Sequence, residues 1–245
     1  MKNLITVLVV LFISTTSVIG SKINTNGGDD KKKSITDGSQ ILGRVYFDLG
    51  LNILRDAPSE MEISAFQSKS AGFYYMRQFP IGKKMSFNPS LGVTMEKYSF
   101  NKDVVLGNFT TSQNIDSLTF FTVAGIDIKR SKLATSFIEV PVEFRYYFKG
   151  NDSDAGLYLA LGGFVGIRIE THTKLKFTEA DVKKVDKRRG GFQQNNLRYG
   201  IQGRIGYKGI NLFYKHSLVS IFGANGPVNT SDTAYSTIGI SISGL

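Results

Sequence analysis

Apolar and polar residues alternate with a period of two in several stretches of the chain, most clearly between Ser136 and Phe148. One side of this stretch holds Ile138, Val140, Val142, Phe144 and Tyr146, and the other holds Glu139, Pro141, Glu143, Arg145 and Tyr147. The alternation predicts a β-strand, because successive side chains of a strand point to opposite faces. The pattern fits a water-soluble sheet, with its apolar face on a core, and a membrane barrel, with its apolar face on lipid.

Alternation of this kind predicts about eight strands, at 44–52, 72–79, 85–98, 136–148, 156–170, 197–207, 210–218 and 235–244. The connections between them alternate in length: the long ones are 53–71, 101–135, 171–194 and 221–233, and the short ones are 80–84, 149–155 and 208–209. An even strand count places both chain ends on the side of the short turns. Sorting of loops by length is typical of outer-membrane barrels, and a soluble sandwich has no reason for it.

The sequence therefore predicts an all-β fold, an antiparallel up-and-down transmembrane β-barrel at residues 44–245. The long connection 101–135 carries an apolar piece, Leu118–Ile128, that we expect to extend a neighbouring strand above the membrane. Pro89 and Pro141 lie inside predicted strands of a closed barrel, where a proline removes a ladder donor. We expect a β-bulge at each proline.

Residues 1–20 have the features of a cleavable signal peptide, with a basic start, a short apolar run at 4–13 and small residues after it. An N-terminal membrane anchor is the alternative, but the apolar run is shorter than the roughly 20 residues that a spanning helix needs. Residues 21–43 are polar and contain glycine, which predicts a flexible leader.

Composition agrees with an exported barrel. The chain has 26 Gly, 18 Phe and 11 Tyr, and it has no cysteine for a disulfide, a lipid attachment or a thiolate metal site. Its formal net charge of +10 favours an anionic surface as partner, since an exported protein does not meet nucleic acid. We expect the cell outer membrane as location and outer-membrane lipids as partners.

The strand sequences also resemble a known family. The pairing of I-E-V-P-V-E-F-R-Y-Y-F with G-L-Y-L-A-L-G-G-F-V-G, followed by R-Y-G-I-Q-G-R-I-G-Y-K-G-I-N-L-F-Y-K-H-S-L, resembles the PorT-like outer-membrane β-barrel family from about Arg44 onward. The founding member of that family takes part in a secretion pathway for surface proteins. The resemblance thus implies a barrel, and as an alternative role a component of a type IX-like secretion system with envelope or secretion-machinery partners. The chain ends in Ser243-Gly244-Leu245, where barrels commonly have an aromatic residue.

Charged residues of both signs fall on the inward faces of the predicted strands. They are Asp48, Glu96, Glu139, Glu143, Arg145, Arg168, Glu170, Arg198, Arg204 and Lys215. Side chains fill the interior of a barrel of about eight strands, so these charges are expected to pair as a lumen network. A conducting pore is the alternative, and it would need more strands or a sparser lumen.

The connection 171–194 is rich in cations, among them Lys183, Lys184, Lys187, Arg188 and Arg189. These side chains could contact anionic lipid headgroups or a partner protein, and a solvated charged loop is the alternative.

The sequence offers little for catalysis. His216 and Ser217 could act with Glu143 as a hydrolase, but neighbouring strand residues point to opposite faces. Asn151-Asp152-Ser153-Asp154 lacks the spacing of a calcium loop. We expect no enzyme activity, no cofactor, no metal and no small-molecule substrate. The predicted function is a structural or interaction role through long extracellular loops; a soluble periplasmic β-protein that binds a small apolar ligand is a further alternative.

Overall fold

The computed structural model describes residues 43–100, 105–107, 119–121, 127–150, 156–179, 181–224, 226 and 230–243. The predicted signal peptide lies outside the described residues, and so do the predicted leader up to residue 42, the turn at 151–154 and the last two residues. The described residues all belong to one compact unit, Ile41–Leu245. No helix in this described part is long and apolar enough to cross a membrane.

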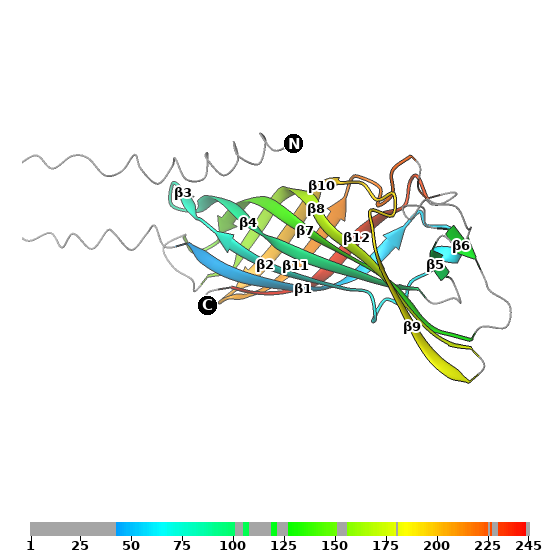
Figure 1. The fold of residues 1–245 in the computed structure, drawn as a ribbon. Helices are drawn as coiled ribbons and strands as arrows, with labels where there is room; N and C mark the ends of the chain where they lie inside the picture. The colour runs from blue at the N-terminus through cyan, green and yellow to red at the C-terminus, as the bar shows by residue number, and fades with distance from the viewer. Residues whose placement is uncertain are drawn as a thin grey trace, which may run out of the picture. The chain divides into compact units, whose positions relative to one another are not determined.

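Eight strands form a closed antiparallel ring (Figure 1). They are β1 (Arg44–Arg55), β2 (Lys69–Met76), β4 (Met85–Phe100), β7 (Asp127–Tyr147), β8 (Tyr158–Glu179), β10 (Leu197–Tyr207), β11 (Ile210–Ser217) and β12 (Ala234–Ser243). Each of them pairs with the next ring strand along the chain, and β12 pairs with β1 to close the ring. The predicted up-and-down barrel is confirmed.

Five of the described elements lie outside the ring, and four of them are only three residues long. The 3-10 helix η2 (Ser59–Met61) follows β1, and β3 (Phe79–Ile81) pairs with β4. Among the described residues, strands β5 (Val105–Gly107) and β6 (Thr119–Phe121) pair only with each other. The expectation that the apolar piece at 118–128 extends a neighbouring strand is therefore wrong for its described residues 119–121, which extend no barrel strand. It is right for Asp127 and Ile128, which begin β7.

The two ends of the ring differ. The short connections lie at one end, where the start of β1 pairs with the end of β12 through Tyr46 and Ser243. We call this the turn end, and the opposite end the loop end. At the loop end, β7 and β8 run past the ring: β8 pairs with β10 only as far as Ile167, and farther on it pairs with β9 (Val182–Arg189). Figure 1 shows β9 projecting beyond the ring at this end.

We refer to residues 127–135 of β7, 171–179 of β8 and strand β9 as the extension. The expectation that 127–135 and 171–194 are loops is wrong for most of these residues, because they form three paired strands. The cause lies in the sequence. Strand β9, VKKVDKRR, is exposed on nearly all of its length and has no apolar face, so alternation of apolar residues could not reveal it.

Burial alternates along the ring strands, and the outward positions are apolar. Strand β10 shows the pattern clearly, with exposed and buried residues in strict succession at both of its ends. Large apolar side chains stand outward on every ring strand, for example Leu49, Phe73, Val93, Ile138, Leu161, Ile205, Leu212 and Ile240. A continuous apolar surface of this kind would be unfavourable in water, and it matches the lipid-facing band of a membrane barrel.

The prolines do not produce the expected bulges. The ladder between β4 and β7 is interrupted between Pro89 and Gly92 and resumes in the same register. The ladder between β7 and β8 is continuous at Pro141. A local loss of pairing, without an inserted residue, therefore accommodates the missing proline donors. The register shifts lie elsewhere on β7, between Ile128 and Arg130 and between Ser136 and Phe137.

Candidate functional site

The lumen of the ring is filled by side chains at each level along β7. From the loop end to the turn end, the buried residues on the inward side of β7 are Leu133, Thr135, Phe137, Glu139, Pro141, Glu143, Arg145 and Tyr147. An apolar layer therefore comes first, two charged layers follow, and an aromatic layer lies at the turn end. Each layer is completed by the other strands of the ring.

The first charged layer is centred on Glu139, and we call it the Glu139 cluster. Arg198 of β10 donates to Glu139 and also to Glu96 of β4, the latter at 2.5 Å between Nη1 and Oε1. Lys215 of β11 donates to the other oxygen of Glu139. All four side chains are at most 6% exposed. Two carboxylates thus share two cations, and all four side chains are buried from bulk solvent.

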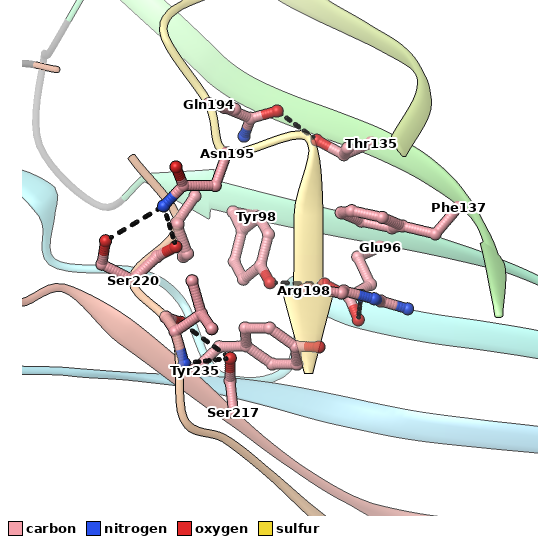
Figure 2. A pocket seen from close by; sticks show the side chains of 12 residues that line it. Glu96, Tyr98, Thr135, Phe137, Gln194, Asn195, Arg198, Ser217, Ser220 and Tyr235 are labelled. Atoms are coloured by element: carbon pink, nitrogen blue, oxygen red, sulfur yellow. Dashed lines mark hydrogen bonds and ion pairs between the residues drawn. The ribbon is translucent and has the colours of Figure 1, made fainter. Parts of the chain in front are cut away.

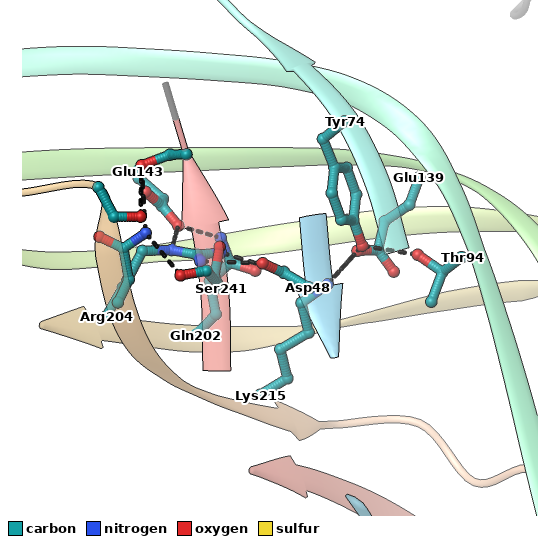
Figure 3. Close-up of polar contacts among 12 residues, drawn as sticks. Asp48, Tyr74, Thr94, Glu139, Glu143, Gln202, Arg204, Lys215 and Ser241 are labelled. Carbon is teal, nitrogen blue, oxygen red and sulfur yellow. Dashed lines mark hydrogen bonds and ion pairs between the residues drawn. The ribbon is translucent and has the colours of Figure 1, made fainter. Parts of the chain in front are cut away.

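Two tyrosines, Tyr74 and Tyr98, complete the Glu139 cluster, and Figure 3 shows Tyr74 beside Glu139. The hydroxyl of Tyr74 donates to Glu139 Oε1 at 2.7 Å and accepts from Lys215 Nζ at 2.7 Å. The hydroxyl of Tyr98 donates to Glu96 Oε2 at 2.7 Å. These bonds give each carboxylate a further hydrogen-bond donor, and such additional bonds are what make a buried ion pair tolerable.

The second charged layer is centred on Glu143, and we call it the Glu143 cluster. Arg204 binds Asp48 with both terminal nitrogens, at 3.0 and 3.1 Å, and donates from Nε to Glu143 Oε1 at 3.0 Å. Arg145 donates to the other oxygen of Glu143 at 3.0 and 2.7 Å, and Gln202 donates to Oε1 at 2.9 Å. Glu143 therefore accepts four hydrogen bonds, three of them from arginine side chains.

The buried charges of the described residues balance. Four carboxylates and four cations are buried, so their formal charges cancel. They are Asp48, Glu96, Glu139, Glu143, Arg145, Arg198, Arg204 and Lys215. The signs are also divided along the chain. The carboxylates lie on β1, β4 and β7, whereas every cation except Arg145 lies on β10 or β11.

The loop end of the lumen is closed by an apolar cluster. It combines ring residues with side chains from the connections and consists of Met61, Tyr98, Phe100, Leu133, Phe164, Phe192, Phe222 and Tyr235. Next to it lies a cavity of about 20 Å³, bordered by Glu96, Tyr98 and Arg198 (Figure 2). A water molecule needs about 10–15 Å³, so the cavity has room for water and not for a solute. The described lumen therefore offers no continuous path.

Eight of the ten residues predicted for the lumen network are in the two clusters, and two are not. Arg168 is half-buried at the rim, where it donates to the backbone oxygen of Gly191 at 2.9 Å. Glu170 is exposed and pairs with Arg189, at 3.2 Å between Oε1 and Nε. Its expected inward position is wrong because the register shift opposite Ser136 and Phe137 adds one residue, Ile169, which reverses the alternation beyond it.

Sequence reasoning missed the neutral partners of the network. Tyr74 lies in a stretch whose aromatic residues made its two faces indistinguishable, and Tyr98 lies at the end of a predicted strand. Gln202 alternates with Arg198 and Arg204 on the inward face of β10, so its spacing was the available signal.

The cations predicted as a loop contact all lie on β9. Lys183, Lys184, Lys187 and Arg189 are exposed, and Arg188 is half-buried and pairs with Asp186 at 2.8 Å. Alternation within β9 places Lys183, Lys187 and Arg189 on one face of the extension and Lys184 and Arg188 on the other.

His216 and Ser217 lie on opposite faces of β11, as alternation requires. His216 Nδ1 lies 3.2 Å from the Tyr214 hydroxyl and 3.3 Å from that of Ser236 on the outer side. Ser217 is buried and donates to the Val219 backbone oxygen at 2.7 Å. Within the residues described, no group of three or more His, Cys, Asp and Glu side chains could hold a metal ion.

Comparison with known proteins identifies one family. A family model described as "Outer membrane protein beta-barrel domain" matches residues 43–225. No curated protein matches the chain at a significant level.

Solved structures of low identity align over most of the chain. Ail, the attachment invasion locus protein of Yersinia pestis, aligns at 11% identity with a TM-score of 0.36, covering 82% of this chain and 97% of that one. Ail in complex with the heparin analogue sucrose octasulfate aligns at 10% identity with a TM-score of 0.31, covering 82% and 99%. A mutant porin of Rh. blastica aligns at 11% identity with a TM-score of 0.20, covering 83% and 100%. At these TM-scores the structural likeness carries no functional inference.

Proposed function

The chain belongs to the outer membrane protein beta-barrel domain family, and from this premise we propose that it is a closed barrel that acts as an interaction module at the cell surface. It is an outer-membrane protein, so the alternative of a soluble periplasmic β-protein is wrong. The finer PorT-like assignment is part of the proposal, and it is supported by the strand patterns between 138 and 218.

The observation that carries the proposal is the filled lumen. Two neutralised ion clusters and an apolar cluster occupy it, and the cavity between them is about 20 Å³. Because side chains fill the lumen of this barrel, its interactions must be made by the surfaces that lie outside the lumen. At the loop end it presents the extension, whose long strands carry charged, exposed side chains. Long connections of such barrels face the cell exterior, so we place the extension there. The role is non-enzymatic and needs no cofactor.

Surface labelling tests this placement. The chain has no cysteine, so a Val182→Cys variant carries a single thiol at an exposed position of β9. We expect a bulky, membrane-impermeant maleimide to label it on intact cells. A matched variant, Lys83→Cys, places the thiol in the exposed turn between β3 and β4 at the opposite end, and it should react only after the outer membrane is opened. Labelling of Lys83→Cys and not of Val182→Cys on intact cells would reverse the orientation and contradict the proposal.

A conductance measurement tests the closed lumen. The full chain, reconstituted in a planar lipid bilayer, should show no steady ion current, because the charged layers are paired and packed. Persistent single-channel steps from the folded protein would show that the lumen conducts, and the proposal would fail.

A further inference from the structure

The outward face of the extension carries a row of cations that lie directly opposite one another. Lys132 of β7 pairs with Lys174 of β8, and Lys174 pairs with Lys187 of β9. Directly opposite residues of paired strands share a face, and so do alternate residues of each strand. The same register places further cations on this face, namely Lys97, Arg130, Lys176, Lys183 and Arg189.

Few negative charges offset this row. Glu170, on this face, is paired with Arg189 at 3.2 Å, and Asp127 lies in register with Thr178 and Lys183 at the far end of the row. Asp186 lies on the opposite face and pairs with Arg188. Among the described residues, no carboxylate lies within ion-pair distance of Lys132, Lys174 or Lys187.

Like charges directly opposite in a sheet repel, so this row costs stability in the absence of an anion. The neighbouring positive charges also act on Lys132. Its pKa lies below the ordinary value because of partial burial and the positive charges nearby, which are Lys97, Arg130, Lys174 and Lys176. An anion bound across the three strands would relieve this repulsion.

The row lies on the same side of the barrel as the lipid-facing residues. Ile138 and Ile167 are opposite one another on the outer face, and the outward pairs that follow are Ser136 with Glu170, Ala134 with His172 and Lys132 with Lys174. Lys174 lies five residues beyond the exposed Ile169, which is about 17 Å along a strand. A strand tilt of about 40° brings this to about 13 Å above the apolar band. Lysine side chains reach back toward a membrane surface, so the row lies at the level of lipid headgroups.

We propose that the outward face of the extension, centred on Lys132, Lys174 and Lys187, binds the phosphate-bearing headgroups of anionic lipids in the leaflet at the loop end. The assignment deepens the proposed function, on which it rests for the side of the membrane. Lysine binds phosphate as a point charge, and three lysines across adjacent strands offer a site that no single loop residue provides. Attraction of one lysine to an anionic membrane surface corresponds to about a fivefold gain in binding.

Fluorescence quenching can test the preference, because the chain has no tryptophan. The Ile169→Trp variant of the full chain places one reporter at the foot of the extension. It is reconstituted in phosphatidylcholine vesicles that contain either brominated phosphatidylglycerol or brominated phosphatidylcholine. We expect the relative lipid affinity from quenching to favour phosphatidylglycerol by about fivefold. A control reporter, Ile240→Trp on the lipid-facing side of β12, should show no preference.

Charge variants in the Ile169→Trp background identify the residues. Replacing Lys132, Lys174 and Lys187 together by Gln should abolish the preference, and the single Lys174→Gln variant should reduce it. Lys184→Gln removes a cation from the opposite face of β9 and should leave it unchanged. The gel mobility shift between unheated and heated samples verifies that each variant is folded, and Lys174→Gln alone suffices if the triple variant is not.

Three outcomes would overturn the proposal: equal quenching by both brominated lipids at Ile169→Trp, a preference that survives the triple substitution, or a preference abolished by millimolar inorganic phosphate. The last would identify a small-anion site in place of a lipid site. Quenching does not depend on which way the barrel faces or on the closed lumen, so this result is separable from the labelling and conductance results.

Discussion

Arg204 holds Asp48 through two parallel hydrogen bonds, of 3.0 and 3.1 Å, that connect β10 with β1 inside the ring. Arg204 also donates to Glu143, so one guanidinium serves two carboxylates that are at most 3% exposed. Removing it leaves two negative charges with fewer partners in a space that excludes water.

Replacing Arg204 by Met is expected to lower the free energy of unfolding by about 3–5 kcal/mol, the cost of breaking a buried pair by removing one partner. Urea unfolding of the refolded protein in detergent measures it. Lys83→Met, in an exposed turn, should change the free energy of unfolding by less than about 0.5 kcal/mol. Arg204→Lys keeps the charge but loses the two-nitrogen geometry, so an intermediate loss is expected. Equal stability of Arg204→Met and the unsubstituted protein would contradict the network.

Gly200 and Gly203 lie on the same strand, but their surroundings differ, so substitution by alanine should affect the stability of the barrel differently at the two positions. A Cβ at Gly200 would lie 2.2 Å from the backbone oxygen of His216 and 2.7 Å from the ring of Phe164. A Cβ at Gly203 would meet Leu161 at 3.6 Å, an ordinary contact. Gly200→Ala should therefore destabilise the barrel by about 1–3 kcal/mol. Gly203→Ala should be neutral within about 1 kcal/mol.

The two variants are compared by gel electrophoresis of samples heated to increasing temperatures. The measured quantity is the temperature at which the band of the folded protein disappears. If both variants melt at the same temperature, the close approach of β10 to β11 and Phe164 is not as described.

Phe192 and Phe66 differ in burial: Phe192 lies inside the apolar cluster that closes the loop end, and Phe66 is exposed to solvent. Phe192 is 1% exposed within the apolar cluster at the loop end, whereas Phe66 is 82% exposed. Phe192→Ala should cost about 3–5 kcal/mol and open the loop end to water, while Phe66→Ala should have little effect. Urea unfolding gives the energies, and limited proteolysis of the 190–196 connection reports the opening. Unchanged proteolysis in Phe192→Ala would argue against the seal.

His172 lies in the extension beyond the ring, and it reports on the charge of that face. Its pKa is lowered by partial burial first and then by Lys187, with smaller contributions from Glu170, which raises it, and from Arg189 and Lys174. The unfolded chain binds the proton more readily than the folded one. The stability contribution of His172 is thus present above about pH 6.5 and is lost as the pH falls through the folded pKa.

An NMR titration of the His172 ring should give a midpoint below the ordinary histidine value. Lys187→Gln should raise the midpoint, and Lys184→Gln on the other face should not. A midpoint that is insensitive to Lys187 would show that the two side chains do not share a face.

Alternation of apolar residues was enough to predict the ring, because lipid outside and a packed lumen inside impose the same period of two on all eight strands. The same alternation also predicted that the Glu139 and Glu143 side chains point into the lumen. It could not reveal β9 or the start of β7, where Lys and Arg occupy the outward face and no apolar period exists. It misplaced Glu170, because a bulge at Ile169 leaves no mark in the pattern.

The pairing of individual charges in the lumen could not be predicted from the sequence, for another reason. Arg204 pairs with Asp48 at a separation of 156 residues, and only the register of the closed ring brings them together. The sequence predicts that charges must pair, since an isolated buried charge is too costly, but it does not say which cation meets which carboxylate.

The division of buried charge along the chain also constrains how the barrel can assemble. Strands β1, β4 and β7 present carboxylates to the lumen, and most of the neutralising cations arrive only with β10 and β11. A partly built barrel would therefore hold an unpaired acidic inner face that must stay hydrated. Contacts between distant parts of the chain form late and slow folding. Loss of lumen water and closure of β12 onto β1 thus become one cooperative event, without a stable half-barrel on the way.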